Sequence, residues 1–193
     1  MEATLISWTP NPFALVYRLF MHNKWGEAMP DERICEHELA RASDAEFAFI
    51  KELLFEDWCP LLEFPNFAWQ FRVPRSLHAQ IRVARHGSFF SQSHQVHQPT
   101  HFADEGDYFE IPGLNELQRE RERNAMARAQ VSYQDMLEAD IVCSLARGVL
   151  PMHINLELAA SFNLRAMFQL FTRRRCNVLQ GSYWNPLLDA MAT

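Results

Sequence analysis

Two segments far apart in the chain alternate apolar and polar residues, as a strand with one buried face requires. Residues 67–73 read FAWQFRV and end at a proline. A second alternation follows Pro151, with Ile154, Leu156 and Leu158 at its apolar positions. Because successive side chains of a strand point to opposite faces, this pattern predicts two strands that each bury one side. An apolar sheet face must be covered by another layer, which limits the chain to layered folds.

Helical patterns fill much of the remaining chain. Asn11 and Pro12 are typical of a helix start, Ser43 with Glu46 has the spacing of a capping box, and Ser161 is the predicted cap of a later helix. A further short strand is predicted at residues 4–9. The predicted helices span residues 11–25, 47–58, 75–86, 113–146 (in one or two pieces), 163–175 and 178–191.

Strands interleaved with longer helices indicate an α/β (or α+β) fold. No repeat or low-complexity linker divides the 193 residues, so we predict a single domain over 1–193. Residues 88–112 are predicted to be rich in loops, and the polar stretch 26–43 receives no assignment.

The charge of the chain restricts its partners. A net charge of −6 argues against a general nucleic-acid binder and against an anionic-membrane binder, since both need a basic surface. Sixteen of the 18 basic residues are arginine, whose planar guanidinium binds phosphate or carboxylate through two parallel hydrogen bonds. This bias fits a small phosphate-bearing ligand, and a GC-rich genome explains it equally well.

The four cysteines are far apart and form no C-x-x-C motif, which excludes a zinc ribbon and a thioredoxin-like site. With no recognisable signal peptide and no apolar run of about 18 residues, a reduced, cytoplasmic protein is expected. His94, His97 and His101 suggest a metal hydrolase as the weakest of three hypotheses, because Pro99 breaks any helix there and no carboxylate completes a known motif.

Two arginine-rich segments are candidates for an anion site. The stretch RVARHGSFFSQS, residues 82–93, places arginines at a helix end beside a Gly-Ser turn, where N–H groups, hydroxyls and guanidinium groups converge. Arg173, Arg174 and Arg175 end a later helix, where they can interact with the helix dipole. Neighbouring residues of a helix point about 100° apart, so at most two of these three can face a site. Neither a P-loop nor a dinucleotide-binding glycine motif is present.

The order of these segments resembles the flavin-dependent thymidylate synthases, whose signature is R-H-R-x7-S with a glutamine three residues before it. Without gaps, Gln80 takes the glutamine position, Arg85 the last arginine and Ser93 the serine. The fragment FEIP at 109–112 is similar to the family's F-x-I-P.

The C-terminal half resembles the family more closely. Residues 133–151, YQDMLEADIVCSLARGVLP, are similar to the family block Y-x-x-L-L-E-x-G-x-x-x-E-x-A-R-x-x-L-P. Asn163 and Arg165 match its N-x-R, and Arg174 matches the arginine that follows nine residues after Arg165. The resemblance covers roughly residues 45–185 and implies a twisted, mainly antiparallel sheet flanked by helices.

The resemblance also implies roles for individual residues. Arg174 would face the pyrimidine of a uridine monophosphate, where negative charge develops during chemistry at C5, which makes it the expected catalytic residue. The substrate-binding positions are Gln80, Arg85, Ser91, Ser93, Gln95, Arg147 and Arg174. The FAD-binding positions are Glu63, His86, Asn163, Arg165 and Gln169.

Several positions depart from the family pattern. Val83 and Ala84 replace the first Arg-His of the signature, and Val178 replaces a late histidine. Ser91 replaces an acidic residue, and Gln95 replaces an arginine beside the sugar and phosphate. A smaller rim bearing hydroxyls would admit a ribose 2′-OH, as in the specialised branch of the family that methylates UMP for nucleoside antibiotics of the polyoxin type.

The leading hypothesis is therefore reductive C5-methylation of UMP or dUMP with FAD, NADPH and 5,10-methylenetetrahydrofolate. The second hypothesis is a pyrimidine-nucleotide-binding protein of the same fold that has lost its flavin. The resemblance further implies a homotetramer whose active sites are shared between subunits, with no nucleic-acid or membrane partner.

Overall fold

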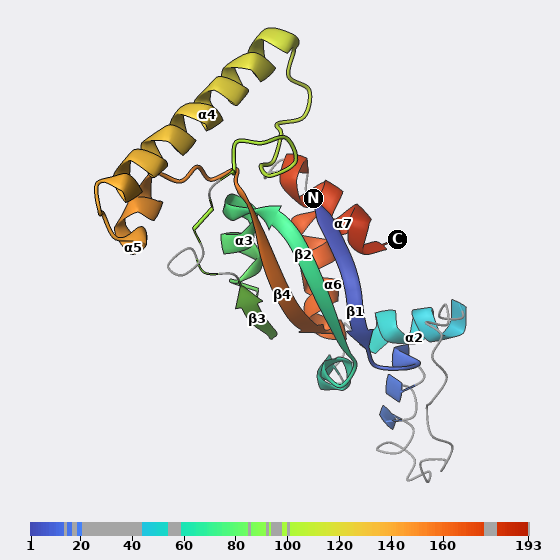
Figure 1. Ribbon diagram of the computed structural model, residues 1–193. Coiled ribbons are helices and arrows are strands. Elements are labelled where there is room, and N and C mark those ends of the chain that lie inside the picture. Colours follow the sequence, from blue (N-terminus) through green and yellow to red (C-terminus); the bar gives the residue numbers. More distant parts are fainter. Residues whose placement is uncertain are drawn as a thin grey trace.

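Four antiparallel strands form the centre of the molecule (Figure 1). The computed structural model describes residues 1–13, 15, 16, 19, 20, 44–53, 59–84, 86–91, 93, 98, 99, 101–175 and 181–192. The strands are β1 (Glu2–Trp8), β2 (Asn66–Pro74), β3 (Gly87–Ser91) and β4 (Asn155–Asn163), in the order β1-β2-β4-β3. The antiparallel sheet within a mixed α/β fold confirms the predicted fold class.

One face of the sheet is the main core. Trp69 lies opposite Ala160 and Phe71 opposite Leu158, so the alternation of β2 and β4 places these buried side chains on the same face. Three helices cover this face with apolar residues: α3 (Arg75–Ile81), α6 (Leu164–Arg174) and α7 (Gly181–Ala192). Two smaller elements, α2 (Asp44–Leu53) and the 3₁₀ helix η1 (Cys59–Glu63), contribute to the same core.

A long helix, α4 (Glu116–Glu138), extends away from the sheet and carries α5 (Cys143–Ala146) at its far end (Figure 1). A capping box between Asn115 and Gln118 starts α4. A second apolar cluster, which includes Met126 and Tyr133, packs under this arm. The chain then returns to β4 through the 3₁₀ helix η2 (Arg147–Val149).

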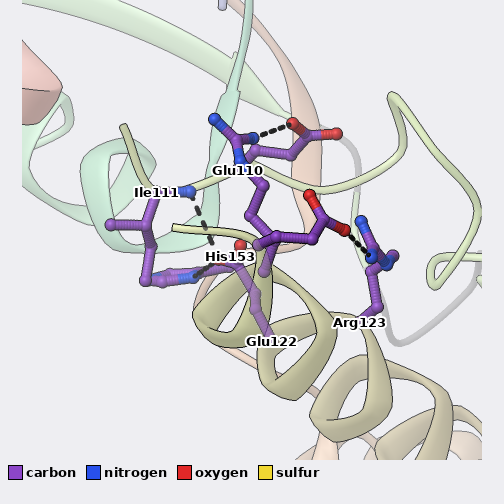
Figure 2. A network of polar contacts seen from close by, with 7 residues as sticks. Glu110, Ile111, Glu122, Arg123 and His153 are labelled. Carbon is purple, nitrogen blue, oxygen red and sulfur yellow. Dashed lines mark hydrogen bonds and ion pairs between the residues drawn. The ribbon is translucent and has the colours of Figure 1, made fainter. Parts of the chain in front are cut away.

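Polar contacts fasten α4 to the body of the protein (Figure 2). Glu122 Oε1 accepts a hydrogen bond of 3.2 Å from the backbone N–H of Ile111 and lies 3.8 Å from His153 Nδ1. The other ring nitrogen of His153 lies 2.8 Å from the hydroxyl of Tyr183 on α7. These contacts connect α4, the segment before it and α7, so they fix the direction of the arm.

The structure corrects three sequence predictions. Residues 88–91, expected at the start of the loop-rich stretch 88–112, belong to β3 and pair with β4. The helix expected over 75–86 ends at Ile81. Ser161 lies inside β4, and Asn163 caps α6 instead, its side-chain oxygen accepting a 2.8 Å hydrogen bond from the N–H of Ala166.

The other expected elements are found with shifted bounds. The helix expected at 47–58 corresponds to α2 as far as Leu53, and residues 54–58 lie outside the described residues. The expected segment 113–146 is two helices separated at Asp140, which has a φ of 59°. The capping residue Ser43 and the stretch 26–43 lie outside the described residues, as does most of the helix expected at 11–25. None of the helices within the described residues has the length and apolar character needed to cross a membrane.

Candidate functional site

A cavity of about 390 Å³ lies where α3, the end of β3, η2 and the start of β4 meet. It is lined by Arg75, His78, Ala79, Arg82, Ser91, Ser93, Arg147, Met152 and Leu156. Three residues expected to bind substrate, Ser91, Ser93 and Arg147, therefore lie at one cavity although they come from distant parts of the sequence. We call this cavity the basic cavity, because three of its lining residues are arginines.

The basic side of the cavity comes from one face of α3. Arg75, His78 and Arg82 are three and four residues apart, and this spacing places side chains on the same face of a helix. Arg82 belongs to the segment predicted to bind an anion, whereas Arg75 and His78 were not among the predicted site residues. The helical spacing of the three basic residues was the signal that could have found them.

The arginines of the basic cavity are fixed by backbone carbonyls. Arg75 Nη1 donates to the oxygen of Leu150 at 3.0 Å, and Arg147 Nε donates to the oxygen of Ser144 at 3.0 Å. Within the described part of the chain, neither these two arginines nor Arg82 forms an ion pair with a carboxylate. Their charge therefore remains available to a bound anion.

His78 is the most buried polar residue of this cavity, with only 8% of its surface exposed. Its Nε2 atom is buried and has no hydrogen-bond partner among the described residues. Burial, followed by the positive charges of Arg82 and Arg75, lowers the pKa of His78 below its usual value. The imidazole is consequently neutral near pH 7 and can donate one N–H without adding a further charge.

A smaller hollow of about 130 Å³ lies between the turn after α3 and α6. It is lined by Val83, Ala84, Ala166, Gln169, Leu170, Arg173 and Arg174. Arg174 thus lies at a concave surface, beside the two positions where the sequence departs from the Arg-His of the signature. Val83 has 68% of its surface exposed.

Trp184 of α7 holds two of the expected substrate residues. The guanidinium carbon of Arg174 lies 5.0 Å from the centre of the Trp184 ring, within the range of a cation–π contact. The indole Nε1–H of Trp184 donates to Gln80 Oε1 at 2.9 Å. Because Trp184 is only 1% exposed, it is a rigid support for both side chains. No local sequence signal marks Trp184 as a site residue, since an aromatic residue in an apolar helix is ordinarily a core residue.

Most of the expected cofactor residues lie on α6 or next to its start, at the end of β4 and in η1. Arg165 Nη1 lies 2.5 Å from Glu63 Oε1, so an ion pair joins α6 to η1. Asn163 uses its side-chain oxygen to cap α6, and Gln169 lines the smaller hollow. His86 is exposed and has a φ of 63°, in the left-handed region.

Some predicted site residues cannot be placed. Arg85, Gln95, His94 and His97 lie outside the described residues, and His101 is exposed. Among the residues that the structure does describe, no three histidine, cysteine or acidic side chains gather as a metal site would require.

The two hollows share no lining residue. Ser91, Ser93 and Arg147 belong to the basic cavity, whereas Arg174 belongs to the smaller hollow and contacts Gln80 through Trp184. The expected substrate residues therefore fall into two groups.

Comparison with known proteins identifies the family. The family model Thy1, described as thymidylate synthase complementing protein, matches residues 4–182. The chain belongs to the Thy1 family. This confirms the resemblance to the flavin-dependent thymidylate synthases. The family match covers nearly the whole sequence, including N-terminal residues that the resemblance had not reached.

A solved Thy1-like structure supports the fold. The chain is similar to thymidylate synthase X (ThyX) from Helicobacter pylori, solved with FAD and dUMP. The TM-score is 0.70 at 17% sequence identity, and the match covers 99% of this chain and 91% of the other. No curated protein in the comparison matches the sequence significantly.

Proposed function

We propose that this chain catalyses flavin-dependent reductive C5-methylation of a uridine monophosphate, UMP or dUMP. The proposed carbon donor is 5,10-methylenetetrahydrofolate, and the proposed reductant is NADPH. The observation that carries the proposal is the position of Arg174, fixed on Trp184 at the edge of a hollow in a chain of the Thy1 family. The FAD and dUMP in the Helicobacter pylori ThyX structure support the same reaction class.

The proposed chemistry explains the need for a fixed guanidinium. C5 of uracil is a weak nucleophile, and its attack on the donor carbon moves electron density toward the ring oxygens. Arg174 would donate hydrogen bonds to that developing charge, and Trp184 holds it in place before the reaction starts. C5 bonds to the donor carbon and loses its proton, and the two bonds from that carbon to the folate nitrogens break, so that tetrahydrofolate leaves with protons on those nitrogens. When bound, FAD supplies the hydride that reduces the transferred carbon, after NADPH has reduced the flavin.

The residues around the smaller hollow fit one section of FAD. Gln169 offers an amide to the polar edge of a flavin. Arg165, held by Glu63, is a fixed cation on the neighbouring surface. A hollow of about 130 Å³ is small beside the pockets of several hundred Å³ that whole cofactors occupy, so the rest of FAD must be bound by other surfaces.

A shared active site accounts for this arrangement. If two copies each contribute one hollow, Ser91, Ser93 and Arg147 of one subunit can meet Arg174 of another. We therefore propose the homotetramer that the resemblance implies. The open face of the sheet is a suitable contact surface, because it is lined by apolar and small residues that include Ala68, Ala159 and Phe90, the last with 82% of its surface exposed.

Phe90→Glu tests this assembly. The new charges would face one another or an apolar surface in the assembly, so the variant is expected to sediment as smaller species than the wild type. Analytical ultracentrifugation at equal concentrations measures this. Leu117→Glu, at an exposed position at the start of α4, is the matched control and should sediment like the wild type. Unchanged mass for Phe90→Glu, or a monomeric wild type, would contradict the proposed interface.

The departures near the sugar favour a ribonucleotide substrate. Ser91 lines the basic cavity at the position where the resemblance expects an acidic residue. Its small hydroxyl leaves room for a ribose 2′-OH and can accept or donate a hydrogen bond to it. We therefore propose UMP as the preferred substrate, within a specialised, cytoplasmic branch of the family, in a chain that acts as one domain.

A second candidate function is pyrimidine-nucleotide binding without flavin. The observation in its favour is that Val83 and Ala84 present apolar side chains to the smaller hollow, where the signature has two basic residues. Such a protein would retain the basic cavity and lack the chromophore.

The visible spectrum of the purified protein decides between these two functions. The enzyme hypothesis predicts flavin absorption at near-stoichiometric occupancy after incubation with FAD and removal of the excess. The same measurement on Arg165→Gln should show weaker retention of FAD, and Arg119→Gln, which is remote on α4, should match the wild type. A colourless wild type that cannot be reconstituted but binds UMP would support the flavin-free function instead.

A further inference from the structure

One face of α3 carries more basic side chains than the proposed substrate residues account for. Arg75, His78 and Arg82 all line the basic cavity, and none of them was assigned a role by the family resemblance. Arg147 approaches the same cavity from η2. Four basic side chains from two elements therefore converge on a single space in a chain whose net charge is −6.

These guanidinium groups are oriented without being neutralised. Arg75 and Arg147 each donate one hydrogen bond to a backbone carbonyl, of Leu150 and Ser144 respectively. A guanidinium has five N–H donors, so most of them remain for another acceptor. Elsewhere in the described chain, arginines such as Arg72 and Arg165 are paired with carboxylates at 2.6 Å and 2.5 Å. The remaining donors at the basic cavity are therefore available to an acceptor that a ligand supplies.

The buried ring of His78 is the second, independent sign of a ligand. Its Nε2 atom has no hydrogen-bond partner in the described structure, although 92% of the residue's surface is covered, as the 8% exposure implies. Leaving a buried polar atom without a partner is costly, and native proteins generally avoid it. Because the neighbouring charges are positive, an anionic oxygen is the acceptor that best suits an Nε2–H group at this position.

The size and lining of the cavity identify the class of anion. A volume of about 390 Å³ exceeds what a small inorganic ion fills and suits a phosphate with an attached sugar. Ser91 and Ser93 provide hydroxyls on one wall, and Met152 and Leu156 provide apolar surface for a sugar or base. A phosphate monoester has enough oxygens to bond several guanidinium groups and a histidine at once.

We propose that Arg75 and His78 of α3, Arg82 at the C-terminal cap of that helix, and Arg147 bind the phosphate of a nucleoside monophosphate in the basic cavity. His78 donates Nε2–H to a phosphate oxygen, and the arginines supply the charge. The inference rests on the proposed function for the identity of the nucleoside, but not for the anion site itself. His78 and Arg82 thereby determine specificity, because they contact the phosphate that distinguishes a nucleotide from a nucleoside.

Isothermal titration calorimetry with three probes tests the proposal: inorganic phosphate, UMP and uridine, at one fixed ionic strength. Wild type is expected to bind UMP at least about 100-fold more tightly than uridine, and to bind inorganic phosphate measurably, because several charge-assisted hydrogen bonds depend on the phosphate. Arg82→Gln should weaken the binding of UMP and of inorganic phosphate by about 10- to 100-fold and leave the binding of uridine unchanged. Arg82 is exposed at the end of α3, so this variant should fold.

Two further variants complete the test. His78→Phe keeps a ring of similar size in the buried position and removes the donor, so it should reproduce the selective loss for UMP and phosphate. Arg121→Gln removes an exposed arginine of α4 and should behave as the wild type. A thermal melt of each variant confirms folding.

The outcomes separate this inference from the proposed function. Equal affinities for UMP and uridine, or wild-type affinities in Arg82→Gln and His78→Phe, would overturn the phosphate subsite and leave the methylation proposal standing. Binding of inorganic phosphate that is lost in Arg82→Gln, without binding of UMP, would support the anion site and oppose a UMP-methylating enzyme. A wild type that binds none of the probes at millimolar concentration would overturn the inference.

Discussion

Arg174→Ala is expected to lower the methylation turnover by about 100- to 1,000-fold while leaving the protein folded. Removing one preorganised donor that stabilises developing oxygen charge has an effect of this size in other enzymes. Arg174 is suited to this role because its guanidinium lies over the ring of Trp184, 5.0 Å from the ring centre, at the edge of a hollow. The measurement is the initial rate of methylated nucleotide formation at saturating UMP or dUMP, with FAD bound.

Arg173→Ala is the matched control. Arg173 precedes Arg174 on α6, lines the same hollow and has an exposed side chain. It has no ring contact with Trp184, so its loss should reduce the rate by far less than the loss of Arg174. Circular dichroism melts of both variants should remain close to that of the wild type. Retention of more than about a tenth of the wild-type turnover in Arg174→Ala would exclude the catalytic role.

Local pattern predicted the central strands well. Residues 67–73 form β2 as expected, because a period of two and a terminating proline are both local signals. β3 was missed because its sequence, GSFFS, places two aromatic residues side by side. Phe89 packs against Phe162 with ring centres 5.7 Å apart, whereas Phe90 faces outward with 82% of its surface exposed. Only the pairing with β4 reveals that this segment is a strand.

The cap of α6 shows how tertiary contacts decide between similar residues. Ser161 and Asn163 are both good helix caps by composition. β4 continues through Ser161, which pairs with Ala68 and Ser88, and ends at Asn163. The sheet therefore sets the start of the helix, and no sequence pattern within the helix itself contains that information.

The candidate site was predictable where a family motif exists and not where this chain differs. The resemblance indicated Ser91, Ser93 and Arg147, which the structure places at one cavity, although their roles remain predictions. His78 was missed because a histidine in an arginine-rich helix has no special signal, and its burial depends on the surrounding elements. Trp184 was missed because its contacts with Gln80 and Arg174 join distant parts of the sequence.

Trp184→Ala is expected to lower the free energy of unfolding by about 3–5 kcal/mol, as is typical when a large buried aromatic side chain is removed. Trp184 is among the largest fully buried side chains and belongs to the main core cluster with Leu187 and Leu188. The change removes packing against α6 and the sheet and leaves a cavity that the neighbouring helices can fill only in part. Urea denaturation followed by circular dichroism measures the loss.

Trp184→Phe separates the packing role from positioning of the site. Phenylalanine keeps an aromatic ring near Arg174 but removes the Nε1–H that donates to Gln80 at 2.9 Å, so the stability loss should be about 1–3 kcal/mol. We expect a lower kcat with little change in KM, because Arg174 would still be present but less well fixed for the charge that develops during the reaction.

Tyr183→Phe is the control for that experiment. It removes one hydroxyl from the neighbouring position of α7, whose 2.8 Å contact is with His153 and not with Arg174. A similar small loss of stability with unchanged kcat is expected, since the contact fastens the arm and not the site. Equal kcat for Trp184→Phe and the wild type would show that Trp184 supports the core alone and that Arg174 is positioned by other contacts.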